Sequence, residues 1–143
     1  MSQPLISVVI PAYNHERFVD YAIESILGQT CQDFELVIVN DGSTDRTERV
    51  IQGYDDDRIR YYYQEYQDAY NTINRGISLA QGKFIAILNS DDVYVADRLE
   101  RLLNFCRDGD KVCAFSDVIP VDDQNNEFTD PEFGWNVWHR DNR

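Results

Sequence analysis

The 143-residue chain has the composition of a globular protein, with 43% hydrophobic and 27% charged residues, and its length suits one domain with its own core. Its 26 acidic residues against 13 basic ones give a formal net charge of −13. Such a surface repels nucleic acid and anionic lipid headgroups, so we expect no nucleic-acid partner. No apolar run reaches the ~20 residues that a membrane-spanning helix needs, and the first residues do not form a signal peptide.

The cysteine pattern argues against disulfide and zinc chemistry. Cys31, Cys106 and Cys113 are an odd number, form no CxxC pair and have no neighbouring histidine. They indicate reduced, mostly packed thiols in a cytosolic protein. We therefore expect a cytoplasmic location, with any attachment to the inner face of the membrane being peripheral.

Short apolar runs alternate along the chain with stretches in which apolar residues recur at helical spacing. The apolar runs predict five strands, at Leu5–Ile10, Phe34–Val39, Ile59–Tyr63, Phe84–Leu88 and Val112–Phe115. The helical spacing predicts four helices, over Phe18–Leu27, Val50–Tyr54, Tyr70–Ala80 and Leu99–Cys106. Pro11 is expected to end the first strand, Asn14 to cap the first helix, and Ser43 or Thr44 to cap the second.

This alternation predicts an α/β fold with a mostly parallel sheet flanked by helices. The run Phe84–Leu88 predicts a central strand buried on both faces, and the more polar third strand is expected nearer an edge. We expect a single domain over residues 1–143, with an α/β core over 1–119 and an irregular tail over 120–143. Trp135 and Trp138 in this tail favour docking on its own domain, the alternative being a partner site.

Two adjacent carboxylates, Asp91 and Asp92, stand where the strand Phe84–Leu88 ends. In an open α/β sheet, ligands bind outside the carboxyl ends of the strands. Two acids there repel an anion but suit a divalent cation with oxygen ligands, which could then hold a phosphate. The alternative is a solvated Asp-Asp turn that caps the next helix.

The ends of the first two predicted strands also carry candidate ligand contacts. The chain has neither GxGxxG after the first strand nor GxxxxGK[ST], which argues against a dinucleotide site and a P-loop. Tyr13 could lie against a flat base, the alternative being a half-buried loop tyrosine. Asp41 could accept from a base N–H or a ribose hydroxyl, the alternative being an Asx turn shaped by Gly42. With Asp91 and Asp92, these residues predict a nucleoside diphosphate site.

Four segments carry a resemblance to a known family. They are Ile6–Asn14, Phe34–Asp45, Asn74–Ile77 and Asn89–Asp92. In order and spacing these segments resemble the family 2 glycosyltransferases, which have the GT-A fold, and the resemblance extends from Ile6 to Phe115. It therefore covers most of the chain rather than one isolated motif.

The resemblance implies roles for particular residues. Pro11, Ala12, Tyr13 and Asp41 would hold the nucleobase, and Asp91 would hold the ribose. Asn74 belongs to a nucleotide-binding segment, and Asp92 would bind Mn²⁺ or Mg²⁺ on the diphosphate. By family habit the nucleotide would be uridine diphosphate.

The chain also departs from the family pattern. The metal motif often reads Asp-x-Asp-Asp, whereas its first position here is Asn89. A basic residue often precedes Asn74, but Ile73 stands there, and Tyr66–Ala69 replaces a stretch that is usually Gly-rich. Diphosphate contacts are therefore expected to be weaker or to come from elsewhere, with Arg75 as a candidate.

The largest departure concerns length. Family members extend further, so we expect the acceptor half and a general-base carboxylate to lie beyond Arg143, which leaves the catalytic base unknown. His139 and the acids of the tail fall too early in the chain for that role.

The function implied is metal-dependent, inverting transfer of a sugar from a nucleotide-diphosphate sugar to the hydroxyl of a saccharide, lipid-linked or protein acceptor. One alternative is a non-catalytic nucleotide-sugar-binding module or an inactive fragment. Another is an α/β interaction domain whose acidic turns have no chemical role. The oligomeric state is open, and a homo-oligomer is compatible with the sequence.

Overall fold

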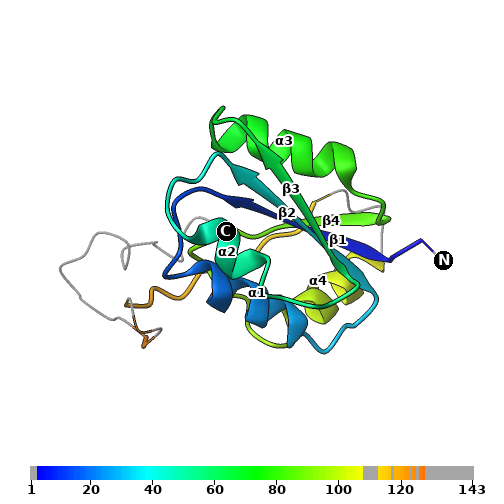
Figure 1. Ribbon diagram of the computed structural model, residues 1–143. Helices are drawn as coiled ribbons and strands as arrows, with labels where there is room; N and C mark the ends of the chain where they lie inside the picture. The colour runs from blue at the N-terminus through cyan, green and yellow to red at the C-terminus, as the bar shows by residue number, and fades with distance from the viewer. Residues whose placement is uncertain (1–2, 108–112, 117, 123, 125, 128–143) are drawn as a thin grey trace.

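The protein is an α/β domain with one parallel sheet. The computed structural model describes residues 3–107, 113–116, 118–122, 124 and 126–127 (Figure 1). The elements are β1 (Ile6–Ala12), α1 (Val19–Leu27), β2 (Phe34–Asp41), α2 (Thr47–Ile51), β3 (Ile59–Gln64), α3 (Ala69–Leu79), β4 (Phe84–Ile87) and α4 (Arg98–Arg107). All neighbouring strands pair in parallel, in the order β3-β2-β1-β4. The predicted fold class is confirmed, and β3 lies at an edge as predicted.

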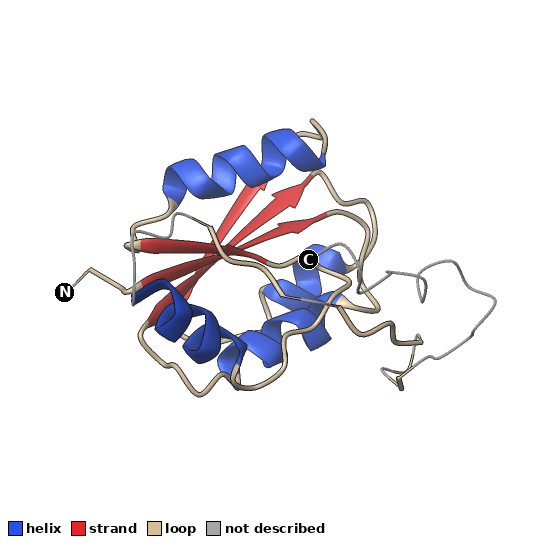
Figure 2. Ribbon diagram, turned by 180° about the vertical axis from the view of Figure 1, so that it is seen from behind, coloured by secondary structure: helices blue, strands red, loops and turns tan. Residues whose placement is uncertain are grey.

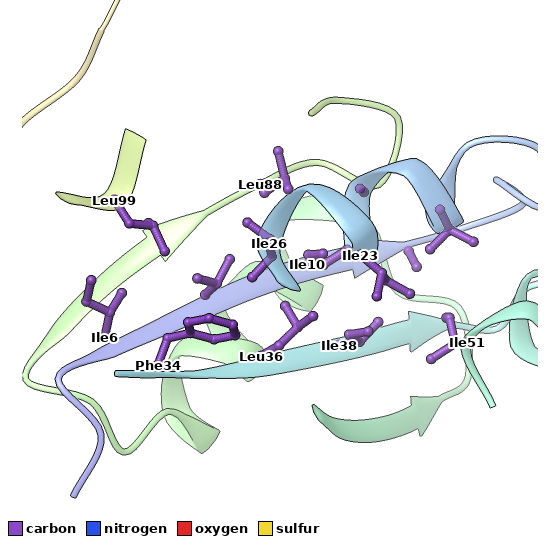
Figure 3. Packing of buried hydrophobic residues seen from close by; sticks show 14 of the residues in the cluster. Ile6, Ile10, Ile23, Ile26, Phe34, Leu36, Ile38, Ile51, Leu88 and Leu99 are labelled. Atoms are coloured by element: carbon purple, nitrogen blue, oxygen red, sulfur yellow. The ribbon is translucent and has the colours of Figure 1, made fainter. Parts of the chain in front are cut away.

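The sheet lies between two layers of helices. Helices α1, α2 and α4 lie on one face and α3 lies on the other, as Figures 1 and 2 show from opposite sides. The main core forms where α1 packs on β1 and β2 (Figure 3). Ile10, Leu36 and Ile38 from the strands and Ile23 and Ile26 from α1 are fully buried there. Because both faces of β1 and β2 are covered, these strands read as nearly continuous apolar runs.

Helix α3 approaches the sheet through small residues. A Cβ added to Gly76 would lie 2.3 Å from Cγ1 of Val9, so only glycine allows this approach. The buried residues of α3 are Thr72 and Gly76, whereas Tyr70 is 82% exposed and Ile77 is 36% exposed. The helix was correctly predicted, but its apolar spacing indicated the wrong buried face, because close packing selected its small residues instead.

Strand β1 continues through Pro11 to Ala12, so the prediction that Pro11 ends the strand is wrong. The backbone N–H of Leu88 donates to the carbonyl of Val9 at 3.0 Å, so Val9 directs its backbone groups toward β4. The backbone nitrogen of Pro11, two residues later, also points to the β4 side of the strand, but β4 has already ended at Ile87. The missing N–H of Pro11 therefore falls where no ladder partner remains.

Strand β4 lies at the edge of the described sheet, so its prediction as a central strand buried on both faces is wrong. Phe84 and Ala86 pack against the main core, but Ile85 and Ile87 are each 45% exposed on the α3 side of the sheet. An apolar run predicts that both faces are covered without saying which element covers them. Helix α3 contacts β1 and β2 and leaves this part of β4 open.

Beyond α4 the predicted pattern changes. Residues 113–116 form no strand, so the strand predicted at Val112–Phe115 is wrong over its described part; Val112 itself lies outside the described residues. A single antiparallel bridge pairs Val121 with Glu127. Trp135 and Trp138 also lie outside the described residues, so the docking of the tail stays a prediction.

In the part of the chain that the structure describes, no helix is both long enough and apolar enough to cross a membrane. All three cysteines are free. Cys31 and Cys106 are partly buried and Cys113 is exposed.

Candidate functional site

The loops that follow β1 and β2 are hydrogen-bonded to each other. Asn14 has a positive φ of 52°, and its Oδ1 accepts from the backbone N–H of Thr44 at 2.8 Å. The backbone N–H of Asn14 in turn donates to Oγ of Ser43 at 3.0 Å. Neither helix has a side-chain cap from these residues, so their predicted capping roles are wrong. Their polar groups join the two loops instead.

Asp45 strengthens the same junction. Its Oδ2 accepts from the backbone N–H of Glu16 at 3.0 Å, and its Oδ1 accepts from that of Thr47 at 2.9 Å. Burial raises the pKa of Asp45, but the hydrogen bonds from Thr47 and Glu16 outweigh this and hold the pKa below its usual value. This carboxylate is therefore committed to holding the loops together.

The residues predicted to contact a nucleobase lie at this junction. Pro11 and Ala12 are the last residues of β1, with Ala12 buried and Pro11 half-buried. Tyr13 follows and is 43% exposed. Its ring lies beside that of Tyr66, which follows β3, with ring centroids 4.8 Å apart and planes inclined by 47°. An exposed aromatic face is thus present where the base was predicted.

Asp41 ends β2 and is only 3% exposed. Its Oδ1 accepts from Nε2 of Gln64 at 2.6 Å and from the backbone N–H of Gln67 at 2.9 Å. Asp41 therefore does not form the local Asx turn that was its alternative reading. These two bonds hold one carboxylate oxygen and bring the segment after β3 against the end of β2.

The acidic pair lies in the turn that follows β4. The backbone N–H of Asp92 donates to the carbonyl of Asn89 at 3.1 Å, and Nδ2 of Asn89 donates to Oδ2 of Asp92 at 3.0 Å. Asp91 and Asp92 are exposed, whereas Ser90, which precedes them in the turn, is buried. Asn89, the departure from the family motif, thus orients the carboxylate of Asp92.

His15 connects the β1 loop to this acidic turn. Its Nδ1 lies 2.7 Å from Oγ of Ser90, and its Nε2 lies 4.0 Å from Oδ2 of Asp91. Its backbone N–H donates to Oγ1 of Thr47 at 2.9 Å. One residue therefore joins the loops after β1 and β2 to the turn after β4. Tyr13, Asp41, Asp91 and the loops between them form one continuous structure at the carboxyl end of the sheet.

Asn74 is the predicted site residue that does not join this structure. It is exposed on α3, and within the described part of the chain no hydrogen bond ties its side chain to the other predicted residues. Its neighbour Arg75 donates from Nη1 to Oε1 of Gln64 at 2.9 Å. Arg75 therefore supports the Asp41 end of the site in this arrangement, rather than the acidic turn where a diphosphate was expected.

The acidic turn could hold a divalent cation whose remaining coordination positions are filled by water and a bound diphosphate. The described residues contain no group of three His, Cys, Asp or Glu side chains that could enclose a metal. Mg²⁺ and similar ions are often held by one or two carboxylates together with water and substrate phosphates. Asp92, with Asp91 beside it, supplies exposed carboxylate oxygens of that kind, so these residues could hold such an ion jointly with a diphosphate.

Sequence reasoning missed three contributors: His15, Gln64 and Tyr66. Gln64 is the last residue of β3, so the rule that singled out Asp41 and Asp91 at strand ends would also have singled it out. His15 lies directly in the first strand-end loop. Tyr66 was noted only as a departure from a Gly-rich stretch. Nothing local in the sequence predicts its contact with Tyr13, because 53 positions separate the two residues.

Comparisons with known proteins identify the family of the chain. The model of the family "Glycosyl transferase family 2" matches residues 7–143. The putative teichuronic acid biosynthesis glycosyltransferase TuaG of Bacillus subtilis is 38% identical over 117 residues, which are 80% of this chain and 46% of TuaG. An uncharacterized glycosyltransferase of Rickettsia prowazekii is 40% identical over 101 residues, 71% of this chain and 31% of that protein. The chain thus spans less than half the length of these relatives.

The fold also matches solved structures. S. aureus TarS 1–349 in complex with UDP-GlcNAc superposes with a TM-score of 0.67 and 26% identity, over 73% of this chain and 31% of that TarS chain. The family match covers nearly the whole chain, and the fold superposes on part of TarS 1–349. The chain therefore belongs to glycosyl transferase family 2.

Proposed function

We propose that the protein binds a nucleotide-diphosphate sugar and takes part in the metal-dependent transfer of that sugar to an acceptor hydroxyl, with inversion at the anomeric carbon. The observation that carries this proposal is the joining of Tyr13, Asp41 and the Asp91–Asp92 turn at one end of the sheet, through His15 and the cross-bonded loops. Family membership supplies the class of reaction. UDP-GlcNAc, bound by TarS, makes a UDP-sugar the donor of choice.

Each residue would act on a different part of the donor. Tyr13 would lie against the base, beside Pro11 and Ala12 at the carboxyl end of β1. Asp41 would accept from a base N–H, through the oxygen that Gln64 and Gln67 do not occupy. Asp91 is half-exposed, with 52% of its side chain accessible, and would accept from the ribose hydroxyls. Asn74 keeps its proposed nucleotide contact only if the diphosphate reaches α3.

Asp92 would hold Mn²⁺ or Mg²⁺ together with the diphosphate, and such an ion would supply Lewis-acid stabilisation of the leaving group. The surrounding charge favours this assignment. The chain has a net charge of −13, so an anionic diphosphate is unfavourable beside two aspartates without a cation. The nearby Nδ2 of Asn89 would keep the Asp92 carboxylate oriented.

The acceptor site and the general base would lie in a region that corresponds to the unmatched length of the relatives, which are two to three times as long as the matched part. A carboxylate in that region would take the acceptor proton as the hydroxyl attacks. The acceptor would be a saccharide, a lipid-linked molecule or a protein, in a reducing cytoplasmic compartment that suits three free cysteines.

A second candidate is a nucleotide-sugar-binding module that does not catalyse transfer. The observation that favours it is the engagement of Arg75 with Gln64. Because Ile73 occupies the position where a basic residue is common, a diphosphate at the acidic turn would gain no positive charge from that position or from Arg75.

The first experiment is calorimetric titration of UDP into the protein with Mn²⁺ and again with EDTA. We expect binding with Mn²⁺ that is lost with EDTA, and we expect Asp92→Ala to weaken it at least about tenfold, since charge-assisted contacts are worth about 1.5–3 kcal/mol. Asp57→Ala is the matched control, because Asp57 is also exposed but precedes β3 at the opposite end of the sheet.

UDP binding that is equal with Mn²⁺ and with EDTA would refute the metal assignment. No binding in either condition would refute the donor site. Transfer of radiolabelled sugar to an added acceptor would then exclude the non-catalytic binding module.

A further inference from the structure

We propose that Tyr66 is a second aromatic contact for the nucleobase, so that the base enters between the rings of Tyr13 and Tyr66. This inference rests on the proposed nucleotide site and adds a residue to it. It concerns the free aromatic surface that the end of the sheet presents above Asp41.

The two rings come from opposite sides of β2. Tyr13 follows β1 and Tyr66 follows β3, and β2 lies between these strands in the sheet. Their ring centroids are nevertheless only 4.8 Å apart, so the side chains must meet across the end of β2, where Asp41 and Gly42 lie. A planar ligand that reaches Asp41 therefore meets both rings.

Contacts of the flanking segments fix where the backbone of Tyr66 lies. A Cβ added to Gly42 would lie 2.8 Å from the backbone nitrogen of Tyr66, so the two segments are in close contact. The next residue, Gln67, donates its backbone N–H to Asp41 at 2.9 Å. Asp68 then starts α3 by accepting from the backbone N–H of Asn71 at 2.8 Å. The segment is thus anchored to β2 and α3.

The rings themselves are free to separate. Tyr13 is 43% exposed and Tyr66 is 60% exposed. A base stacked between them needs ring planes about 7 Å apart, which is twice the ~3.5 Å contact distance between carbons. Opening by about 2 Å is within reach of a side-chain rotation, which exposed residues make in picoseconds to nanoseconds.

The interplanar angle of 47° also indicates that the two rings are not an optimised pair, because aromatic pairs prefer offset-stacked or edge-to-face arrangements. Binding would exchange this tilted contact for two base–ring contacts. Base stacking on aromatic side chains tolerates different bases, so Tyr66 would add affinity while Asp41 selects the base.

The test is calorimetric titration of UDP with Mn²⁺ into Tyr66→Ala, Tyr66→Phe and the unchanged protein. We expect Tyr66→Ala to weaken UDP binding about tenfold, in the range typical of a lost base stack, and Tyr66→Phe to bind as the unchanged protein does. Tyr21→Ala, which removes a 47% exposed tyrosine from α1, is the matched control and should have no effect.

Pyrophosphate with Mn²⁺ serves as a ligand without a base. If Tyr66→Ala weakens UDP but not pyrophosphate, the effect lies at the base and supports the proposal. Equal weakening of both ligands, unchanged UDP affinity, or tighter UDP binding would overturn it, the last because Tyr66 would then be an obstacle to the base.

The same titrations separate a failure of the nucleotide site from a failure of the Tyr66 proposal. If the unchanged protein binds pyrophosphate with Mn²⁺ but not UDP, the nucleotide site itself fails. If the unchanged protein binds UDP and Tyr66→Ala binds it equally well, only the role of Tyr66 fails.

Discussion

The two ends of the sheet both carry carboxylates, but they use them differently. At the amino end, Glu35 of β2 is only 6% exposed and accepts from Oγ of Ser7 at 2.5 Å, from the backbone N–H of Gln81 at 2.5 Å and from Nη1 of Arg60 at 2.6 Å. At the carboxyl end, the side chain of Asp91 is 52% exposed, and its Oδ2 lies 4.0 Å from Nε2 of His15.

The difference separates structural from functional carboxylates. Every bond of Glu35 joins another element: β1, β3 and the segment before β4. Its two oxygens accept three hydrogen bonds and are almost fully buried, so they serve the fold rather than a ligand. Asp91 and Asp92 keep exposed oxygens, and their turn is held mainly through Asn89 and Ser90. Removing the carboxylate of Glu35 should therefore affect stability, whereas removing that of Asp91 or Asp92 should affect ligand binding.

The largest expected effect is that of Glu35→Ala. Because it leaves Arg60 partly buried without its ion-pair partner, we expect it to lower the free energy of unfolding by about 3–5 kcal/mol. Asp91→Ala, at an exposed position, should change it by less than about 0.5 kcal/mol. Urea unfolding followed by circular dichroism measures both. Similar losses for the two variants would show that the ends do not differ in this way.

The same contrast predicts a pH dependence. Burial raises the pKa of Glu35, but the hydrogen bonds from Ser7, Arg60 and Gln81 outweigh it and place the pKa below its ordinary value of 4.5. A lowered folded-state pKa means that this stability is present above pH 4.5 and is lost as pH falls through the folded pKa. The unfolding free energy of the unchanged protein should decrease as the pH is lowered below 4.5. That of Glu35→Ala should decrease less steeply over the same range.

An intermediate effect is expected when a glycine at either end of the sheet is replaced by alanine. A Cβ on Gly82 would lie 2.5 Å from the backbone nitrogen of Ser7, so Gly82→Ala should lower stability by about 1–3 kcal/mol through overpacking without changing UDP affinity. Gly42 has φ +69°, so Gly42→Ala should lower stability by about 1–2 kcal/mol. It should also weaken UDP binding, because the new methyl displaces Tyr66.

Thermal unfolding and UDP titration of both glycine variants provide the measurement. The comparison fails if Gly82→Ala weakens UDP binding as much as Gly42→Ala does when both proteins are folded.

The smallest effect is expected from His15→Ala, which removes the link to Ser90. We expect a loss of about 1 kcal/mol in stability, the net worth of a typical hydrogen bond, and weaker UDP binding with Mn²⁺ of about threefold. His15→Asn can keep a donor or acceptor close to Nδ1 and should recover most of the affinity. If His15→Asn and His15→Ala bind UDP equally, the ring does not position the acidic turn through Ser90.

Short-range patterns and one topological rule determined much of this protein. Apolar runs predicted the strands β1 to β4. The rule that ligands bind at the carboxyl ends of parallel strands singled out Tyr13, Asp41, Asp91 and Asp92. Their assembly at one end of the sheet follows from the parallel order of the strands, which the alternation of strands and helices already implies. Family resemblance added the roles that these patterns do not contain.

The tertiary structure alone decided which partner each polar group has. Glu35 received no prediction because its hydrogen-bond donors lie 25 to 46 positions away. The exposure of Ile85 and Ile87 on β4 depends on where α3 crosses the sheet, and the partner of Arg75 depends on the face that Gly76 turns to β1. Local sequence shows which residues can be buried or charged, whereas contacts between distant segments decide which charges are satisfied and which stay available to a ligand.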